Sequence, residues 1–153
     1  MERTLILIKP DAIDRGIAFE VASRFEKKGF KVVAVKMLKM DGAMSKEHYA
    51  HLASKPFYPN IEAYMTSKPM IAMIIEGKDV VNVVRKVVGK TNGREAEPGT
   101  IRGDFSISQQ KNLVHASDSI ETAEKEIKRF FKPEEIFEYK RATEDTFYAR
   151  DEI

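Results

Sequence analysis

The sequence predicts an α/β fold, a β-sheet covered by helices, and two observations lead to that prediction. Short apolar runs such as 4–8 and 70–75 are typical of strands that are buried on both faces. Between these runs lie segments whose apolar residues recur at helical spacing, as Ile17, Val21 and Phe25 do. Strands that alternate with helices in this way indicate a sheet with helices packed on it.

The N-terminal half supplies the first elements of this alternation. The run 4–8 is the first expected strand, and the helix that follows it ends at Gly29, a residue that suits a helix C-terminus. Residues 31–40 are rich in β-branched side chains and predict the second strand. Two short helices are expected over 45–53 and 60–66, joined by a turn that contains two prolines.

The C-terminal half continues the pattern from the third strand, 70–75. The next segment is rich in valine, but its helical spacing and the stop at Gly89 favour a helix. A polar loop without secondary structure is expected over 90–111, and loops of this length in compact domains tend to be functional. A short strand at 113–115 precedes a long amphipathic helix, and the charged tail 133–153 is expected to pack over the surface.

Size and composition restrict the class of protein. A chain of 153 residues fits one domain, 1–153, with a sizeable core. The net charge of +2 is the difference between 26 basic and 24 acidic residues, so nucleic acid is not expected as the main partner. No apolar stretch approaches membrane-spanning length and no export signal is evident, so we expect a cytoplasmic protein without a membrane partner. The absence of cysteine excludes disulfides and thiol chemistry.

The most informative stretch is NLVHASDS at 112–119, in which a short apolar segment delivers His115 just before an expected helix. Asp118 and Glu121 have the spacing of a capping box, so the helix is expected to begin there. The free N–H groups and the dipole of a helix N-terminus favour anions such as phosphate. Neutral imidazole is also a competent nucleophile. His115 is therefore a candidate phosphate acceptor, the alternative being a structural histidine at a strand end.

Three further residues invite a chemical interpretation. His48 and His51 stand three apart in a polar segment and are expected on the surface; without a cysteine or a third histidine nearby, a zinc site is not predicted. Arg102 lies between Gly99 and Gly103, where the backbone can approach a ligand closely. Its guanidinium suits bidentate contact with phosphate, the alternative being a surface arginine in a turn.

Three motifs that occur in this order resemble the nucleoside diphosphate kinase family. They are KPD at 9–11, PGTIRGDF at 98–105 and NLVHASDS at 112–119, and the likeness covers nearly the whole chain. The resemblance implies a ferredoxin-like βαββαβ fold, an antiparallel sheet covered by helices, with a helical hairpin between the second and third strands. It also implies a ping-pong reaction in which a nucleoside triphosphate gives its γ-phosphate to His115 and a nucleoside diphosphate collects it.

The same resemblance implies roles for other residues of this chain. Glu126 would orient the ring of His115, with Ser117 nearby, and Phe57 would stack on the base. Tyr49 would lie near the phosphates. The phosphates or the ribose would be contacted by Lys9, Arg85, Thr91, Arg102 and Asn112.

The expected cofactor is Mg²⁺, carried on the nucleotide phosphates without a direct protein ligand, Asp118 being at most a distant or water-mediated partner. The expected partners are nucleoside tri- and diphosphates and further copies of the chain, since relatives of this length usually form hexamers and some form tetramers.

Two other functions stay open: a catalytically silent nucleotide-binding or regulatory module, and a nucleic-acid-binding protein. The presence of His115 with its neighbours argues against the first, and the near-neutral charge against the second.

Overall fold

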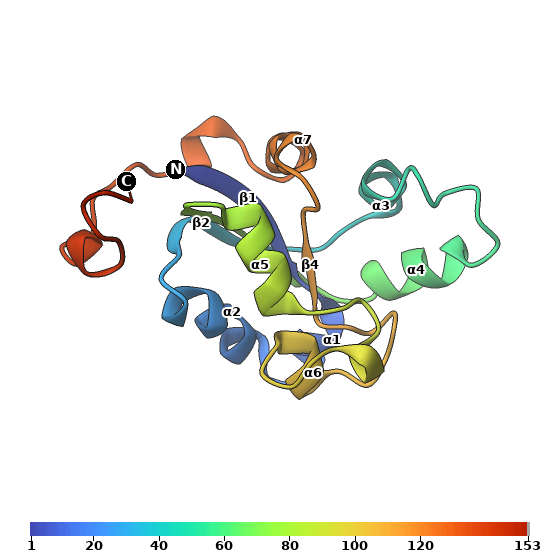
Figure 1. Cartoon of the computed structure of the whole chain (residues 1–153). Helices are drawn as coiled ribbons and strands as arrows, with labels where there is room; N and C mark the ends of the chain where they lie inside the picture. Colours follow the sequence, from blue (N-terminus) through green and yellow to red (C-terminus); the bar gives the residue numbers. More distant parts are fainter. Residues whose placement is uncertain (153) are drawn as a thin grey trace.

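The computed structural model describes residues 1–152 as a sheet with helices on both faces (Figure 1). Four strands pair antiparallel throughout, in the order β2-β3-β1-β4. With the intervening helices, this order is that of the ferredoxin-like βαββαβ fold, so the fold implied by the resemblance is confirmed. The strands are β1 (Glu2–Ile8), β2 (Lys31–Leu38), β3 (Met70–Gly77) and β4 (Val114–Ala116).

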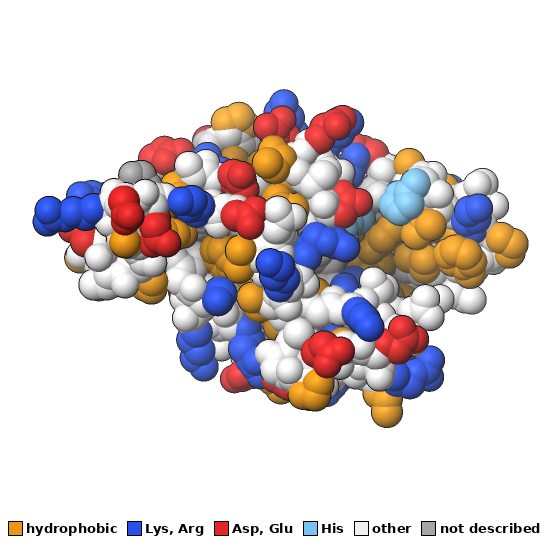
Figure 2. All heavy atoms as spheres, in the orientation of Figure 1, with side chains coloured by type: hydrophobic (Ala, Val, Ile, Leu, Met, Phe, Trp, Pro, Cys, Tyr) orange, Lys and Arg blue, Asp and Glu red, His pale blue; other side chains and the backbone are white. Residues whose placement is uncertain are grey.

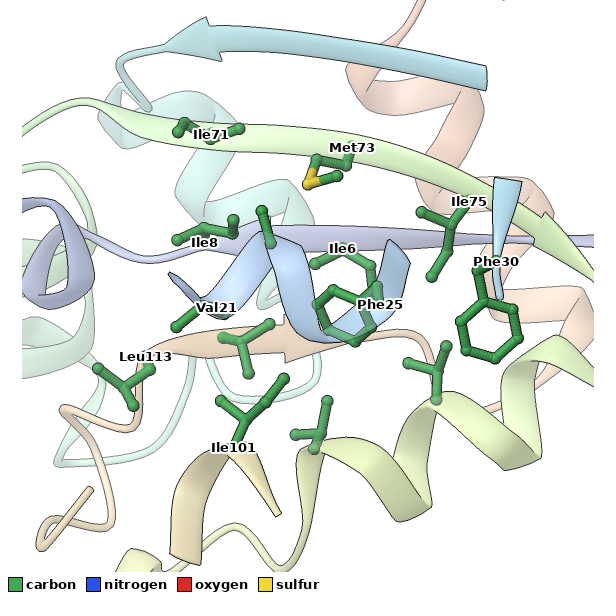
Figure 3. Close-up of a cluster of buried hydrophobic side chains, with 14 of the residues drawn as sticks. Ile6, Ile8, Val21, Phe25, Phe30, Ile71, Met73, Ile75, Ile101 and Leu113 are labelled. Carbon is green, nitrogen blue, oxygen red and sulfur yellow. The ribbon is translucent and has the colours of Figure 1, made fainter. Parts of the chain in front are cut away.

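One face of the sheet is covered by α2 (Ala18–Lys27) and α5 (Val80–Val88). Ile6 and Ile8 of β1 point into this layer together with the side chains labelled in Figure 3. The valines of α5 line the same core, so the helical spacing outweighed the strand preference of valine. This layer is the larger of two hydrophobic clusters.

The other face is covered by α7 (Ile120–Phe130) and by residues of the hairpin between β2 and β3. Leu5 and Leu7 of β1 point this way and pack in the cluster that contains Phe130 and Met65. Because neighbouring residues of a strand face opposite sides, a strand covered on both sides needs apolar side chains at every position. This explains the unbroken apolar run 5–8 in β1.

The hairpin consists of α3 (Gly42–His48) and α4 (Tyr58–Met65) and projects beyond the sheet (Figure 1). Both helices begin earlier than the sequence predicted. Asp41 caps α3, where its carboxylate accepts a hydrogen bond from the backbone N–H of Met44 at 2.8 Å. Pro59 lies in the first turn of α4, a position that suits proline.

The segment 90–111 is not the structureless loop that the sequence predicted. It contains a 3₁₀ turn at Gly93–Glu95 and the helix α6 (Ile101–Phe105), which Thr100 caps. A further helix, α1 (Pro10–Asp14), follows β1 directly and was not predicted. Helices of five residues are too short to display an apolar period, which is why the pattern did not reveal them.

The start of α7 also differs from the prediction by one residue. Ser119 is the N-cap, and its hydroxyl accepts a hydrogen bond from the backbone N–H of Thr122 at 3.1 Å. The capping box proposed for Asp118 and Glu121 is therefore wrong. Glu121 instead pairs with Lys125 one turn along the helix, which leaves Asp118 exposed at the end of the loop after β4.

The C-terminal tail packs along the edge of the sheet, as the sequence predicted, although Ile153 lies outside the described residues. The backbone N–H of Phe137 donates to the carbonyl of Val33 at 2.9 Å, and the guanidinium of Arg141 donates to the carbonyl of Gly29 at 3.0 Å. No helix within residues 1–152 is long and apolar enough to cross a membrane.

Candidate active site

The geometry of His115 is set by a buried carboxylate on α7. Nε2 of His115 lies 2.9 and 3.0 Å from the two carboxylate oxygens of Glu126, and the hydroxyl of Ser117 donates to Glu126 Oε2 at 2.6 Å. An ionised carboxylate can only accept hydrogen bonds, so Nε2 carries the proton. In a neutral ring the lone pair is then on Nδ1. The structure thus brings together the three residues that the resemblance had grouped.

The charge of Glu126 is maintained by these same contacts. Burial acts to raise its pKa, because the side chain is almost completely enclosed. The hydrogen bond and charge of His115, with the hydrogen bond from Ser117, outweigh burial and hold the pKa of Glu126 below its usual range. Glu126 is therefore ionised near neutral pH and stabilises positive charge on the His115 ring.

His48 corrects the prediction of two surface histidines, since only His51 is exposed. The His48 ring meets the His115 ring edge to face, with centroids 4.6 Å apart, and packs in the same way on Phe130. Burial, and then the proximity of His115, lower the pKa of His48 to about 3. His48 is buried although its neighbours Lys46 and Glu47 are exposed, because its ring packs between His115 of β4 and Phe130 of α7.

This packing also creates a group of metal-binding residue types that the sequence did not predict. Ligand atoms of His48, His115 and Glu126 lie within 4.8 Å of one another. The guanidinium of Arg129, however, donates to Nδ1 of His48 at 3.4 Å and places a positive charge beside the cluster. Because this charge opposes a cation, we interpret the cluster as a support for the His115 ring.

Lys9 and Asn112 form a second part of the site at the end of β1. The ammonium of Lys9 donates to Asn112 Oδ1 at 2.6 Å. The Asn112 amide in turn donates to the backbone carbonyls of Thr91 and Gln109 at 3.0 and 2.8 Å. Burial and the charge of Arg102 lower the pKa of Lys9 to about 7. The partly buried ammonium of Lys9 therefore loses its proton more readily than an exposed lysine, and it lies next to the ordered side-chain amide of Asn112.

Arg102 forms hydrogen bonds within the protein, which a residue that only binds a ligand would not need. Its guanidinium donates to the backbone carbonyls of Asn112 at 3.2 Å, Gly89 at 3.1 Å and Val114 at 2.6 Å. The interpretation as a surface arginine in a turn is wrong, since the side chain lies between three chain segments. Three of its five N–H donors are used in this way, which leaves one on each terminal nitrogen.

These residues surround two connected hollows. The first, which we call the inner cleft, has a volume of about 680 Å³ and includes His115, Glu126 and Asp118 in its lining. The second, the outer groove, has a volume of about 770 Å³ and is bounded by the hairpin, Phe57 included. Both hollows share a set of lining residues: Lys9, Tyr49, Thr91, Gln109 and Asn112.

Four basic residues contribute to the wall of the inner cleft, Lys9, Arg85, Lys90 and Arg102, together with three acidic ones, Glu95, Asp118 and Glu126. Figure 2 shows Lys and Arg side chains gathered near the centre of this face, beside a hydrophobic surface over the α3–α4 hairpin.

Every residue predicted for the site lies in one of the two hollows except Ser117, which is buried behind Glu126. Sequence reasoning missed the contribution of Gln109, for which no local pattern gives a signal.

The fold and the site together define a class of protein: an α+β sandwich that presents a carboxylate-oriented histidine to a cleft lined by basic side chains. The sequence model of the family described as nucleoside diphosphate kinase matches residues 2–136. A nucleoside diphosphate kinase of Parabacteroides distasonis is 51% identical over 153 residues, with 100% of each chain covered. One of Pyrococcus horikoshii is 50% identical over 152 residues, covering 97% of this chain and 96% of that protein.

The structural comparison agrees with the sequence comparison. A halophilic nucleoside diphosphate kinase from Halobacterium salinarum, solved in complex with CDP, superposes with a TM-score of 0.93. It is 38% identical, and the match covers 96% of this chain and 98% of that chain. The chain belongs to the nucleoside diphosphate kinase family, and it is an enzyme that transfers phosphoryl groups between nucleotides.

Proposed function

We propose that His115 is the phosphate acceptor and that Nδ1 is its reacting atom. The observation that carries this proposal is the contact between Nε2 and Glu126, which leaves the Nδ1 lone pair available in a cleft that four basic residues line. In the first step Nδ1 forms a bond to the γ-phosphorus of a nucleoside triphosphate. The bond from that phosphorus to the bridging oxygen breaks, and the nucleoside diphosphate leaves with the electron pair. In the second step a β-phosphate oxygen of another nucleoside diphosphate forms a bond to this phosphorus, the Nδ1–P bond breaks, and its electron pair returns to Nδ1.

The residues around His115 then act through charge and position. Glu126 stabilises the positive charge that the ring acquires as the N–P bond forms. Lys9, Arg85 and the two unused N–H donors of Arg102 contact the phosphate oxygens. Phosphoryl transfer depends mainly on such positioning and electrostatic stabilisation, and needs no general base when the nucleophile already has a free lone pair.

The outer groove is proposed to hold the nucleoside. Phe57 is 44% exposed at the groove, so a base can stack on its ring. Tyr49, Thr91 and Asn112 line both hollows and therefore lie where the ribose and phosphates would join. Stacking on one aromatic ring is nearly indifferent to base identity, so we expect broad use of nucleotides.

Mg²⁺ is proposed to enter with the nucleotide as part of the substrate. Four basic side chains line the inner cleft and suit phosphate oxygens better than a resident metal ion. The exposed carboxylate of Asp118 lies at the wall of the cleft and can reach the ion at most through water. On the phosphates, Mg²⁺ neutralises charge that develops during transfer.

Labelling with γ-labelled ATP and Mg²⁺ tests the phosphate acceptor directly. The wild-type protein should acquire phosphate that is stable in alkali and labile in acid, as a phosphohistidine is. His115→Ala should lose the label, whereas His51→Ala, which changes an exposed histidine at the wall of the same cleft, should retain it. If His115→Ala takes up label at the wild-type stoichiometry, the acceptor is another residue.

We further propose that the chain is one domain, is cytoplasmic and assembles into a homohexamer, the tetramer being the alternative. Within the part of the chain that the structure describes, no strand pairs with the outer edge of β2. The C-terminal tail bonds this edge at Val33, but beyond that point Val35 and Met37 are exposed by 59% and 61%. An exposed apolar edge of this kind favours association. Light scattering after size exclusion should return six times the 17.5 kDa chain mass for a hexamer.

A further inference from the structure

The chain adopts a strained turn two residues before His115. Leu113 has φ of +73°, a region that residues other than glycine rarely occupy. The backbone N–H of Val114 donates to the carbonyl of Asn112 at 2.8 Å, which closes a γ-turn around Leu113. The form of this turn with positive φ is rare and strained, so surrounding contacts have to maintain it.

The side chain of Leu113 supplies one of those contacts. It is fully buried, and Figure 3 shows it beside Ile101 in the core between the sheet and the helices. Relaxing the turn would move this side chain out of the core. Burial alone, however, fixes only the position of the side chain and leaves the two polar groups of the Leu113 backbone to be satisfied elsewhere.

The segment 9–11 satisfies both of these groups. The N–H of Leu113 donates to Oδ2 of Asp11 at 3.1 Å, and its carbonyl accepts from the N–H of Lys9 at 2.8 Å. Asp11 lies in α1 and is 8% exposed. Its carboxylate is thus a buried acceptor aimed at the strained residue.

The second oxygen of the same carboxylate reaches the hairpin. The hydroxyl of Tyr64 on α4 donates to Oδ1 of Asp11. Tyr64 lines the outer groove together with Phe57. One side chain therefore connects the turn that leads to His115 with the hairpin that bounds the proposed nucleoside site.

We propose that Asp11 is a positioning residue for phosphoryl transfer: it holds the γ-turn that aims His115 and fixes that turn relative to the nucleotide-binding hairpin. This inference rests on the proposed function of His115. Both carboxylate oxygens bond protein groups, so Asp11 acts through Leu113 and Tyr64 and contacts no substrate.

Asp11 has a second, electrostatic effect that offers an independent measurement. Two charged groups change the pKa of Lys9: the charge of Arg102 on α6 lowers it, and the charge of Asp11 on α1 raises it. A third titratable group, His48 of the hairpin, lies nearby and is neutral above about pH 3. Removing the charge of Asp11 should therefore move the Lys9 limb of a pH profile to lower pH.

The test compares four variants by single-turnover phosphorylation of the full-length protein over a range of Mg·ATP concentrations, which gives both the limiting rate constant and the KM. Asp11→Ala removes both hydrogen bonds and should lower the rate constant at least about tenfold, since small misplacements of reacting groups are costly. Asp11→Asn can accept from Leu113 through its carbonyl and donate to the Tyr64 oxygen, so it should recover most of the rate. Tyr64→Phe should raise the KM for ATP more than it lowers the rate. Asp14→Ala changes an exposed carboxylate of the same helix and should match wild type.

Both Asp11 variants should also shift the Lys9 limb downward in the pH profile of kcat/KM, which reports the free enzyme; a purely structural role would not do this. If a folded Asp11→Ala phosphorylates His115 at the wild-type rate, the proposal is wrong. It is also wrong if Asp11→Asn loses as much activity as Asp11→Ala while both remain folded. Should Asp11→Ala fail to fold, the Asn and Phe variants still decide the matter. A wild-type protein that takes no label on His115 would instead overturn the proposed function.

Discussion

Nucleotide binding should draw a proton onto Lys9. In the free protein, burial and the charge of Arg102 lower the pKa of Lys9 to about 7, although Asp11 partly opposes them. A polyphosphate bound in the inner cleft would favour the charged ammonium and return the pKa toward its ordinary value, about 10.5. A base whose pKa rises on binding takes up protons at every pH between the two values, so uptake is expected in this window and not below it.

The size of the effect follows from the two pKa values. With a pKa of about 7, the free protein has Lys9 almost fully protonated at about pH 5.5, half protonated at about pH 7 and roughly one tenth protonated at about pH 8. The bound form is fully protonated at all three. Binding should therefore take up close to no proton at about pH 5.5, about 0.5 at about pH 7 and about 0.9 at about pH 8.

Titration calorimetry with Mg·ADP measures this uptake directly, when each pH is studied in two buffers of different ionisation enthalpy. The nucleotide phosphates contribute protons of their own, which the Lys9→Arg variant isolates because arginine stays charged throughout. The difference between wild type and Lys9→Arg should grow from about pH 5.5 to about pH 8. Equal uptake by the two proteins at the upper end of this range would show that Lys9 is already protonated in the free enzyme, and its lowered pKa would be refuted.

Three further substitutions test other parts of the site. Glu126→Gln should slow phosphorylation of His115 by about 10- to 100-fold in rapid-quench experiments, because a charged hydrogen bond contributes about 1.5–3 kcal/mol; an unchanged rate would contradict its orienting role. Arg102→Lys should lower the free energy of unfolding by roughly 2–4 kcal/mol in urea without nucleotide, since lysine cannot reach all three carbonyls, and unaltered stability would show that those bonds contribute little. Phe57→Ala should raise the KM for nucleoside diphosphates by roughly tenfold with kcat nearly kept, because base stacking contributes about 1–3 kcal/mol; a loss confined to kcat would place the base elsewhere.

The main strands and the long helices could be predicted from the sequence because each has an apolar pattern of its own. The run in β1 indicates a strand covered on both faces, and the spaced valines of α5 indicate a helix. The short helices α1 and α6 could not be predicted in this way, because five residues span little more than one turn. The antiparallel order of the strands came from the resemblance alone, since alternation does not specify pairing.

Within the site, the residues that face the ligand were easier to predict than those that support them. His115 follows a short apolar segment and precedes an expected helix, a pattern that can be read from the sequence. His48 lies in a polar segment, and only its packing on α7 and β4 shows that it is buried. The role of Asp11 likewise depends on Leu113 and Tyr64, which are far away in the sequence. Arg102 was predicted as a ligand contact, but its three bonds to backbone carbonyls are tertiary and leave no local pattern.

The position of Arg102 has a consequence for how this protein can change over evolutionary time. The guanidinium that we propose to contact phosphate also joins the backbone carbonyls of Gly89, Asn112 and Val114. A substitution that removed it would weaken the fold and the chemistry together, so selection for stability alone would retain it. A descendant that abandoned catalysis should therefore keep Arg102 longer than Arg85, which is exposed on α5 and has only the cleft to serve. If this lineage lost activity, substitutions would be expected first at Arg85 and His115, and last at Arg102, which joins the loops.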